Sequence, residues 1–312
     1  MKPRTILAIV GPTASGKTSL SILLAEMLGG EIVSADSRQV YKYLDIGTAK
    51  PTLEDRARVD HHFIDILEPS QDYSAGQFGI DVPPVIDGII ARGNVPIIVG
   101  GSGLYIRAAI DGMFDGPGRD PEIRGRLEDR LASEGVSALM ATLREVDPVS
   151  AAGMKEVTAR RVIRALEVYL VSGKPLSQHH ADQAKGPKLP SVQVMLDWDR
   201  NMLYERINLR VEAMVEQGLV AEVEGLKKRG YDPKLNALNT VGYKETFEHL
   251  SGATDLPRMI ELIKQNTRHF AKRQLTWFGA DKRIVHLSVN RESEIDKIVA
   301  KVSELYRRAA NV

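Results

Sequence analysis

The fold of this chain is decided by the stretch Thr5-Ile6-Leu7-Ala8-Ile9-Val10-Gly11-Pro12-Thr13-Ala14-Ser15-Gly16-Lys17-Thr18-Ser19-Leu20. An apolar, β-prone run leads into the pattern Gly-x-x-x-x-Gly-Lys-Thr, and a helical periodicity follows, so the pattern lies between a strand and a helix. The helical periodicity is carried by Leu20, Leu23, Leu24, Met27 and Leu28. This arrangement is typical of a phosphate-binding loop.

The loop predicts which chemical group is bound, but not which reaction follows. Its glycines allow backbone N–H groups to curl around a diphosphate or triphosphate at the positive end of the new helix. Lys17 adds a positive charge, and the hydroxyl of Thr18 is suited to bind Mg²⁺. ATP, GTP and a prenyl diphosphate present the same oxygens, so the loop defines only a class of substrate.

Length and composition favour a cytoplasmic enzyme. The 312 residues are 43% hydrophobic and 27% charged, which suits one large domain with an accessory one. The chain has no cysteine, so nothing indicates disulfides or a thiolate metal site. The first strand begins almost at once and no apolar run approaches ~20 residues, so we expect neither a signal peptide nor a membrane span. The net charge of +1 favours a monomer and leaves nucleic-acid binding to local basic patches.

Polar residues follow two further predicted strands, over residues 31–35 and 95–99. Asp36-Ser37-Arg38-Gln39 follows the first, and Gly100-Gly101-Ser102-Gly103-Leu104-Tyr105 follows the second. Ligands bind at the carboxyl ends of parallel strands, so we expect Asp36 and Ser102 beside Lys17. Asp36 fits three roles there: a Mg²⁺ ligand, a base that takes a proton from a nucleophile, or a helix N-cap. The predicted fold class is α/β, with a P-loop NTPase-like parallel sheet flanked by helices.

Helical periodicity replaces strand signals between about Gly112 and Pro190. Gly116-Pro117-Gly118 and Gly186-Pro187 mark the boundaries. We predict an α-helical insertion domain over residues 116–189 and a catalytic core over residues 1–115 and 190–312. Several basic residues cluster in the insertion: Arg124, Arg126, Arg130, Lys155, Arg160, Arg161 and Arg164. Such a cluster suits a phosphate backbone, although a solvated helix face is its usual meaning.

Two later helices also carry basic residues. A helix that begins near Met202 has Arg206 and Arg210 four residues apart, where they either clamp a diphosphate or pair with neighbouring glutamates. A second helix is expected over residues 257–278, and the overlapping stretch 258–283 has seven Lys or Arg against two acids. That stretch is either a nucleic-acid footprint or an ordinary charged face.

Two segments between these motifs yield further expectations. Pro83-Pro84 and Gly93 are expected to bracket an amphipathic helix. His61-His62 is expected to open a strand over residues 61–67. Adjacent side chains of a strand point to opposite faces, which favours surface and core packing of the two rings over a two-histidine metal site.

In its motifs the chain resembles the bacterial tRNA dimethylallyltransferases over essentially its whole length. The N-terminal half contributes Gly11-Pro12-Thr13-Ala14-Ser15-Gly16-Lys17-Thr18, Ser34-Ala35-Asp36-Ser37-Arg38-Gln39-Val40-Tyr41, Asp45-Ile46-Gly47-Thr48-Ala49-Lys50-Pro51, His61-His62 and Gly100-Gly101-Ser102-Gly103-Leu104-Tyr105. The C-terminal half contributes Arg164-Ala165-Leu166-Glu167-Val168, Val241-Gly242-Tyr243-Lys244-Glu245 and Thr267-Arg268-His269-Phe270-Ala271-Lys272-Arg273-Gln274-Leu275-Thr276-Trp277. A phosphate loop alone is common, whereas this ordered series is highly specific.

The resemblance implies a reaction. A dimethylallyl group moves from dimethylallyl diphosphate to N6 of adenosine 37 in tRNAs that read codons beginning with U, giving N6-dimethylallyladenosine and diphosphate. It implies that Asp36 takes the N6 proton and that Ser102, where the family usually has threonine, lies near the breaking C–O bond. Arg206 or Arg210 neutralises the leaving diphosphate; we assign Arg206 to catalysis, with Asp36, Ser102 and Lys17. The remaining assignments are Mg²⁺ on Thr18 and diphosphate on Gly11, Pro12, Thr13, Ala14, Ser15, Gly16, Lys17, Thr18 and Arg210.

The resemblance also implies a tRNA surface that includes the insertion domain. It maps tRNA contacts to Asp36, Ser37, Arg38, Gln39, Ser102, Arg124, Arg160, Arg161, Val162, Ile163, Arg164, Asn239, Thr240, Val241, Gly242, Tyr243 and Lys244. An adenine in the stacked anticodon loop must be flipped into the site, at a cost of a few kcal/mol. Met154-Lys155-Glu156-Val157-Thr158 departs from the His-Pro-Asn-Asp-like turn usual in the family, which alters the contacts expected there.

Two other functions compete with this interpretation. A small-molecule or nucleotide kinase also uses a phosphate loop, Mg²⁺ and a helical lid, but it leaves the Asp-Ser-x-Gln and Gly-Gly-Ser motifs unexplained. A non-catalytic RNA-binding module leaves three motifs idle at the same sheet edge. Phosphoryl transfer from ATP without RNA distinguishes the kinase from a prenyltransferase.

Overall fold

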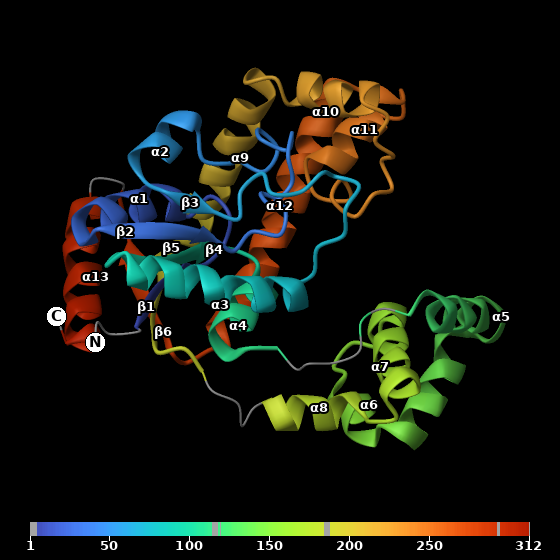
Figure 1. The fold of residues 1–312 in the computed structure, drawn as a ribbon. Coiled ribbons are helices and arrows are strands. Elements are labelled where there is room, and N and C mark those ends of the chain that lie inside the picture. Colours follow the sequence, from blue (N-terminus) through green and yellow to red (C-terminus); the bar gives the residue numbers. More distant parts are fainter. Residues whose placement is uncertain (1–4, 114–117, 119, 184–187, 292–293, 312) are drawn as a thin grey trace. The chain divides into compact units, whose positions relative to one another are not determined.

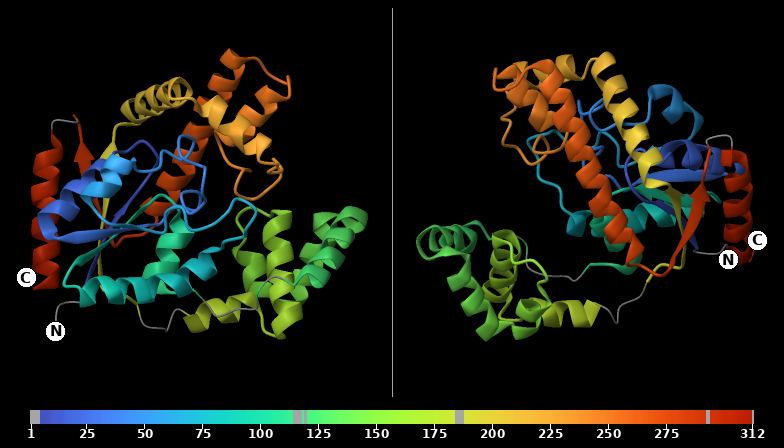
Figure 2. Two further views of the ribbon diagram at one scale, coloured as in Figure 1. Left: turned by 45° about the horizontal axis from the view of Figure 1, so that its top comes forward. Right: turned by 180° about the vertical axis from the view of Figure 1, so that it is seen from behind.

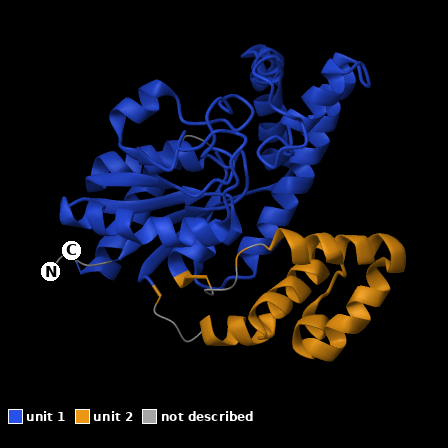
Figure 3. Cartoon of the chain, turned by 45° about the vertical axis from the view of Figure 1, so that its right-hand side comes forward, with its two compact units in different colours: residues 1–110, 189–312 blue, residues 111–188 orange. Residues whose placement is uncertain are grey.

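The chain forms two compact units. The computed structural model describes residues 5–113, 118, 120–183, 188–291 and 294–311. Unit 1 comprises residues 1–110 and 189–312, and unit 2 comprises residues 111–188 (Figure 3). The boundaries predicted from the sequence are 115/116 and 189/190. Four of the turn residues used there, Gly116, Pro117, Gly186 and Pro187, lie outside the described residues.

Unit 1 is built on a parallel sheet, as the sequence predicts (Figure 1). In the described residues the sheet has six strands, in the order β3-β2-β4-β1-β5-β6. They are β1 (Ile6–Val10), β2 (Gly30–Ser34), β3 (His61–His62), β4 (Val95–Gly100), β5 (Ser191–Trp198) and β6 (Ile284–Val289). β1 pairs with β4 on one side and with β5 on the other, so the phosphate loop leaves an interior strand.

Helices cover both faces of this sheet (Figure 2). The helices of unit 1 in the described residues are α1 (Lys17–Leu28), α2 (Leu53–Arg58), α3 (Ala75–Ala91), α4 (Gly103–Asp111), α9 (Arg200–Glu216), α10 (Leu219–Lys228), α11 (Tyr243–Leu250), α12 (Leu256–Gly279) and α13 (Ile295–Ala310). Alternate residues of β1 enter different cores: Leu7 packs toward α1 and α13, whereas Ala8 packs toward α3 and α4. Among the described residues, no helix has the length and apolarity needed to cross a membrane.

The helix expected between Pro83-Pro84 and Gly93 is longer than predicted. α3 begins at Ala75, and both prolines lie inside it. An interior proline removes a backbone hydrogen bond and costs about 3 kcal/mol. Here Ser74 caps the helix by accepting from the Gln77 amide at 3.1 Å, and Phe78 and Val82 are fully buried before the prolines. Burial in the core therefore outweighs the local preference of the prolines.

The strand expected over residues 61–67 is shorter than predicted. β3 contains only His61–His62, and backbone φ angles of 63° at Phe63 and 56° at Asp65 turn the chain away from the sheet. Asp65 is held in this turn by Lys50, whose Nζ lies 2.6 Å from its carboxylate. This ion pair joins residues fifteen positions apart, which periodicity alone does not predict.

Unit 2 is helical, as the sequence predicts. Its helices are α5 (Pro121–Val146), α6 (Pro148–Gly153), α7 (Ala159–Ser172) and α8 (Leu176–Gln183). α5 is interrupted at Gly135, where φ is 79°. α5, α6 and α7 bury a core of their own that includes Leu139, Leu143 and Val162. Asp147 joins α6 to α8 by accepting from the amides of Ser150 and Ser177, both at 2.9 Å.

Candidate active site

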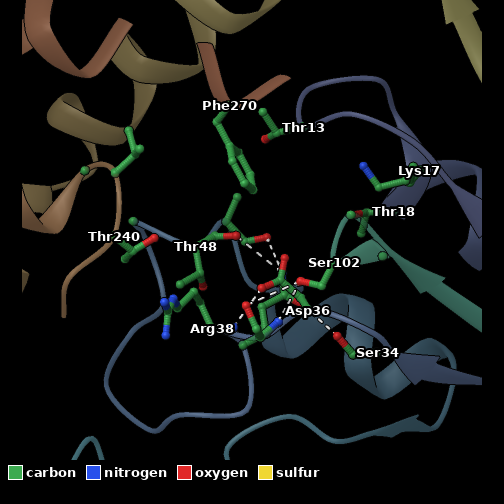
Figure 4. Close-up of a pocket in the computed structure, with 18 of the residues that line it drawn as sticks. Thr13, Lys17, Thr18, Ser34, Asp36, Arg38, Thr48, Ser102, Thr240 and Phe270 are labelled. Atoms are coloured by element: carbon green, nitrogen blue, oxygen red, sulfur yellow. Dashed lines mark hydrogen bonds between the residues drawn. The ribbon is translucent and has the colours of Figure 1, made fainter. Parts of the chain in front are cut away.

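A cavity of about 240 Å³ lies at the carboxyl edge of the sheet in unit 1 (Figure 4). It brings together residues that the sequence placed at this edge from three separate strands. Its lining includes Thr13, Lys17, Thr18, Asp36, Ser37, Arg38, Gln39, Ser102, Arg210, Thr240, Val241 and Gly242. A second hollow runs along residues 14–19 and shares Lys17, Thr18 and Arg210 with the cavity. The phosphate loop therefore borders both spaces.

The phosphate loop owes its shape to residues with positive φ. Gly11 has a φ of 129°, and a Cβ there would lie only 2.8 Å from the Met195 side chain. Ala14 adopts a φ of 62°, and Gly16, with a φ of 92°, is the N-cap of α1. Gly16 has no side chain to occupy the first amides of that helix. The positive end of α1 is therefore suited to an anion.

Two cations meet beside this loop. The Lys17 ammonium donates to the carbonyl of Pro12 at 2.5 Å. Burial and the nearby positive Arg210 lower the pKa of Lys17 to about 7, whereas Asp36 opposes the shift. Burial also lowers the pKa of Arg210. Two desolvated positive groups repel each other, so a bound anion would relieve the cost of holding them together.

The geometry distinguishes the two arginines of α9. Arg206 donates from Nε to the Ala14 carbonyl at 2.8 Å, and its guanidinium lies 4.3 Å from the centre of the Trp198 ring. Trp198 in turn donates to the Ser15 carbonyl at 2.9 Å. Arg206 lines the second hollow, whereas Arg210 lines both that hollow and the main cavity. Arg206 therefore braces the loop from outside the main cavity, into which Arg210 extends.

Asp36 and Ser102 meet through the backbone of Ser37. The Ser37 amide donates to Ser102 Oγ at 3.1 Å, and the Arg38 amide donates to the Asp36 carboxylate at 2.8 Å. Asp36 thus opens a turn, not the helix that an N-cap would begin. Gln39 accepts from the Ser34 hydroxyl at 3.0 Å and closes the turn. Figure 4 shows Asp36 and Ser102 at the base of the cavity, with Lys17 and Thr18 nearby.

Several residues that line this cavity are absent from the predicted site, among them His61, Phe270 and Gln274. His61 Nδ1 donates to the Val59 carbonyl at 2.7 Å, and its buried Nε2 has no hydrogen-bond partner in the described part of the chain. Burial lowers the pKa of His61. Phe270 and Gln274 of α12 also line the cavity. The sequence favours packing for the histidine pair; both rings are half-buried, and His62 Nε2 lies 2.7 Å from the Glu31 carboxylate.

A carboxylate from α10 organises the loop opposite the phosphate loop. Glu222 accepts from three consecutive amides, of Asp45, Ile46 and Gly47, at 3.0, 2.7 and 3.1 Å. It also accepts from the Tyr243 hydroxyl at 2.6 Å. Burial raises the pKa of Tyr243, so this hydroxyl stays protonated and donates. No motif indicated Glu222, because its partners lie far away in the sequence.

The residues predicted to contact tRNA have different environments. In unit 1, Asn239 and Lys244 are exposed, but Tyr243 is buried. In unit 2, Arg160 and Arg161 are exposed, and Arg124 and Arg164 both approach the buried carboxylate of Glu167, at 3.5 and 2.9 Å. The side chains of Val162 and Ile163 are buried in the unit 2 core, because they occupy the apolar face of α7.

The metal expected at Thr18 has few protein ligands available. The described residues hold no group of three or more acidic, histidine or cysteine side chains suited to a metal ion. The Thr18 hydroxyl lines the cavity, and the carboxylate of Asp36 is the one acidic side chain in the described lining. Mg²⁺ commonly takes one or two protein ligands and completes its shell with phosphate oxygens and water. The donor set therefore fits a Mg²⁺ that arrives with a diphosphate.

The fold and the site define a P-loop protein that accommodates an anion beside a carboxylate and a hydroxyl. The family model described as IPP transferase matches residues 39–281, and the one described as Isopentenyl transferase matches residues 4–68. The chain belongs to the IPP transferase family. The resemblance predicted from its motifs is thereby confirmed.

Relatives match over nearly the whole chain. A tRNA dimethylallyltransferase from Pelotomaculum thermopropionicum is 43% identical over 303 residues, covering 97% of this chain and 96% of the relative. The fold is similar to the tRNA isopentenylpyrophosphate transferase of Bacillus halodurans, with a TM-score of 0.72, 38% identity and coverage of 99% and 98%. It is also similar to a eukaryotic dimethylallyltransferase acting on tRNA, with a TM-score of 0.81, 28% identity and coverage of 95% and 77%.

Proposed function

We propose that this chain transfers a dimethylallyl group from dimethylallyl diphosphate to N6 of adenosine 37 in tRNA. The single observation that carries the proposal is that one cavity holds both halves of the required chemistry. Lys17 and Arg210 provide a cradle for diphosphate, and Asp36 and Ser102 provide the edge that faces an acceptor. Membership of the family supports a donor side and an acceptor side in one cavity, since the chain's relatives are tRNA dimethylallyltransferases.

The donor side lowers the barrier by stabilising negative charge. As the allylic C–O bond breaks, its electron pair stays on the leaving diphosphate. The amides at the start of α1, Lys17 and Arg210 are fixed in advance around that charge, which makes them effective in the transition state. A Mg²⁺ held by Thr18 would supply further neutralisation of the diphosphate.

The acceptor side holds the amine and removes its proton. The new N6–carbon bond forms while the C–O bond breaks, and the proton of N6 passes to the Asp36 carboxylate. The Ser37 amide occupies a lone pair of Ser102 Oγ, so the Ser102 hydroxyl is oriented before the substrates arrive. An adenine reaches this edge only when it is flipped out of the anticodon loop.

Binding of the tRNA is assigned to basic and polar groups at the surface. In unit 2, Arg160 and Arg161 are exposed, and Arg124 and Arg164 are arranged around Glu167. In unit 1, residues 239–242 and Lys244 border the cavity or the surface beside it. Such groups contact phosphates and set the register of the RNA. We propose that the enzyme acts as a monomer in the cytoplasm.

The test supplies the chain with Mg²⁺, tRNA whose position 37 is an unmodified adenosine, and either labelled dimethylallyl diphosphate or γ-labelled ATP. We expect label on the tRNA from the prenyl donor only, at N6 of adenosine 37. Replacing adenosine 37 by guanosine is the control, because it removes the accepting amine from that position. Phosphate released from ATP without prenylation would contradict the proposal and indicate a kinase.

A further inference from the structure

Gln274 links two parts of the cavity through a single side-chain amide. It lies on α12, is only 7% exposed and lines the cavity. Its Oε1 accepts from the Thr13 amide at 2.9 Å, at the start of the phosphate loop. Its Nε2 donates to the Gly101 carbonyl at 3.0 Å, one residue before Ser102. One amide group thus spans from the donor cradle to the acceptor edge.

The two partners fix the orientation of this amide. The Thr13 N–H only donates and the Gly101 carbonyl only accepts, so the group between them must present an acceptor to one and a donor to the other. Glutamine does so at this length. An ionised glutamate accepts only, and methionine offers neither a strong donor nor a strong acceptor. The contact also requires glycine at position 101, because a Cβ there would overlap the Gln274 amide.

The helix that carries Gln274 is anchored by other residues. Ala271 packs with Leu203 and Ile207, and Phe278 is buried in the main core. A change of side chain at position 274 therefore leaves the apolar contacts of α12 in place. Thr13 and Gly101, in contrast, would each lose a buried hydrogen-bond partner.

We infer that Gln274 is a positioning residue that sets the spacing between the bound diphosphate and the Ser102–Asp36 edge. This inference rests on the proposed function. The phosphate loop places the carbon that is attacked, and the turn around Ser37 places the groups that act on the amine. A link between Thr13 and Gly101 keeps these two sites in register. Reaction rates are sensitive to such spacing, since a misplacement of 1 Å can cost about 10²-fold.

The experiment compares Gln274→Met, Gln274→Glu and the wild-type chain, with Gln265→Met as the matched control. Gln265 lies on the same helix and is exposed. Single-turnover prenylation is measured at saturating tRNA and dimethylallyl diphosphate. Binding of inorganic pyrophosphate and of tRNA is measured separately, and circular dichroism reports folding. We expect Gln274→Met to lower the single-turnover rate by about 10²-fold. Its tRNA affinity should change by less than about threefold by comparison. Gln265→Met should leave the rate and both affinities unchanged.

The pH dependence of Gln274→Glu supplies a readout that a purely structural role would not give. In its protonated form the introduced carboxyl group both accepts from Thr13 and donates to Gly101, as the amide does. Once ionised it only accepts, and it adds negative charge beside the diphosphate. The rate relative to wild type is therefore expected to rise as pH is lowered through the pKa of that carboxyl group. Gly101→Ala, which displaces the amide from the other side, should reproduce the slow rate of Gln274→Met.

Two results would overturn the inference. One is a folded Gln274→Met variant with the wild-type single-turnover rate. The other is a Gln274→Met variant that loses only tRNA affinity, together with a Gln274→Glu rate that, relative to wild type, does not change with pH. An inactive wild-type chain under the same conditions would instead contradict the proposed function, so the two failures are distinguishable. If Gln274→Met does not fold, Gly101→Ala and Gln274→Glu decide the matter.

Discussion

Asp36 tests the chemical step most directly. Its carboxylate lines the cavity, and it accepts from the Arg38 amide within its own turn. Replacement by Asn keeps an oxygen for that amide but removes the base. We therefore expect Asp36→Asn to lower single-turnover prenylation by about 10²–10⁴-fold, the usual contribution of a general base. The dissociation constant for tRNA, from filter binding, should stay near the wild-type value.

The control for this prediction is Asp232→Asn. Asp232 is exposed and accepts from the Lys234 amide in a similar local turn. It should leave both rate and affinity unchanged. An equal loss of tRNA binding and turnover in Asp36→Asn would argue against the role of Asp36 as a base.

Lys17 allows a prediction about protons. Burial and Arg210 lower its pKa to about 7 in the free enzyme, so a large fraction of Lys17 is neutral between pH 7 and pH 8. A bound diphosphate favours the charged form and raises the pKa. Binding must then take up protons in that pH range. Calorimetry of pyrophosphate binding in buffers of different ionisation enthalpy measures this uptake.

The Lys17→Met variant distinguishes proton uptake by Lys17 from proton exchange by the ligand itself. Pyrophosphate itself exchanges protons near neutral pH, and that contribution is common to both proteins. We expect wild type to take up more protons per bound pyrophosphate than the variant at pH 7.5, and the excess to vanish near pH 5.5, where Lys17 is already charged in the free enzyme. The same proton count for both proteins at pH 7.5 would contradict the lowered pKa.

At the scale of elements, α10 positions a loop through Glu222. Four hydrogen bonds converge on this carboxylate, three of them from the amides of residues 45–47. The loop continues to Thr48, whose carbonyl accepts from Gln39 at 3.3 Å and which lines the cavity. Hydrogen bonds to a charged group contribute about 1.5–3 kcal/mol each, and Gln retains part of them. We expect Glu222→Gln to lower the free energy of unfolding by about 1–3 kcal/mol, measured in urea.

The same variant should affect the acceptor side more than the donor side. Thr48 and Gln39 adjoin the Asp36 turn, whereas the phosphate loop is braced by Trp198 and Arg206. The KM for tRNA is therefore expected to rise while the KM for dimethylallyl diphosphate stays within twofold by comparison. Glu224→Gln, an exposed change on the same helix, is the control. A larger rise in the KM for the prenyl donor would contradict this division of the cavity.

Where a strand has a strong local sequence signal, its bounds were predicted to within a few residues. The apolar run before the phosphate loop is β1, and the run over residues 95–99 is β4. Since β1 and β4 are parallel neighbours, Lys17 and Ser102 were expected at one edge. The errors lie where long-range contacts decide the outcome. Pro83 and Pro84 are held inside α3 by buried neighbours, and residues 63–67 leave the sheet because Lys50 holds Asp65.

Long-range contacts also position the site residues that the sequence could not reveal. Asp36 and Ser102 come shortly after β2 and β4, and Lys17 follows β1 through the phosphate loop, so topology brings them together. Glu222 and Gln274 act on loops about 175 residues away in the chain. Both come from helices whose register against the sheet depends on core packing. No local pattern encodes that register.

At the scale of the whole molecule, unit 2 is inserted at a single point of unit 1. The amide of Leu189 donates to the carbonyl of Ile110 at 2.9 Å, so the two ends of the insertion leave unit 1 side by side. The cores are also separate: the buried cluster around Leu139 and Val162 contains only residues of unit 2. A short Gly-Ser linker is long enough to replace residues 111–188. We expect the shortened chain to unfold in one cooperative transition.

We expect the two units to contribute different functions, with diphosphate binding in unit 1 and part of the tRNA binding in unit 2. The shortened chain keeps the phosphate loop, Lys17 and Arg210, so we expect it to bind pyrophosphate with an affinity within a few-fold of the full chain's. It lacks Arg124, Arg160 and Arg164, and each lost phosphate contact lowers both tRNA affinity and its salt dependence. Prenylation at low tRNA concentration should therefore be lost. Lys17→Met in the shortened chain is the control, because it should abolish pyrophosphate binding. A shortened chain that folds and prenylates tRNA at the wild-type KM would show that unit 2 is not part of the tRNA surface.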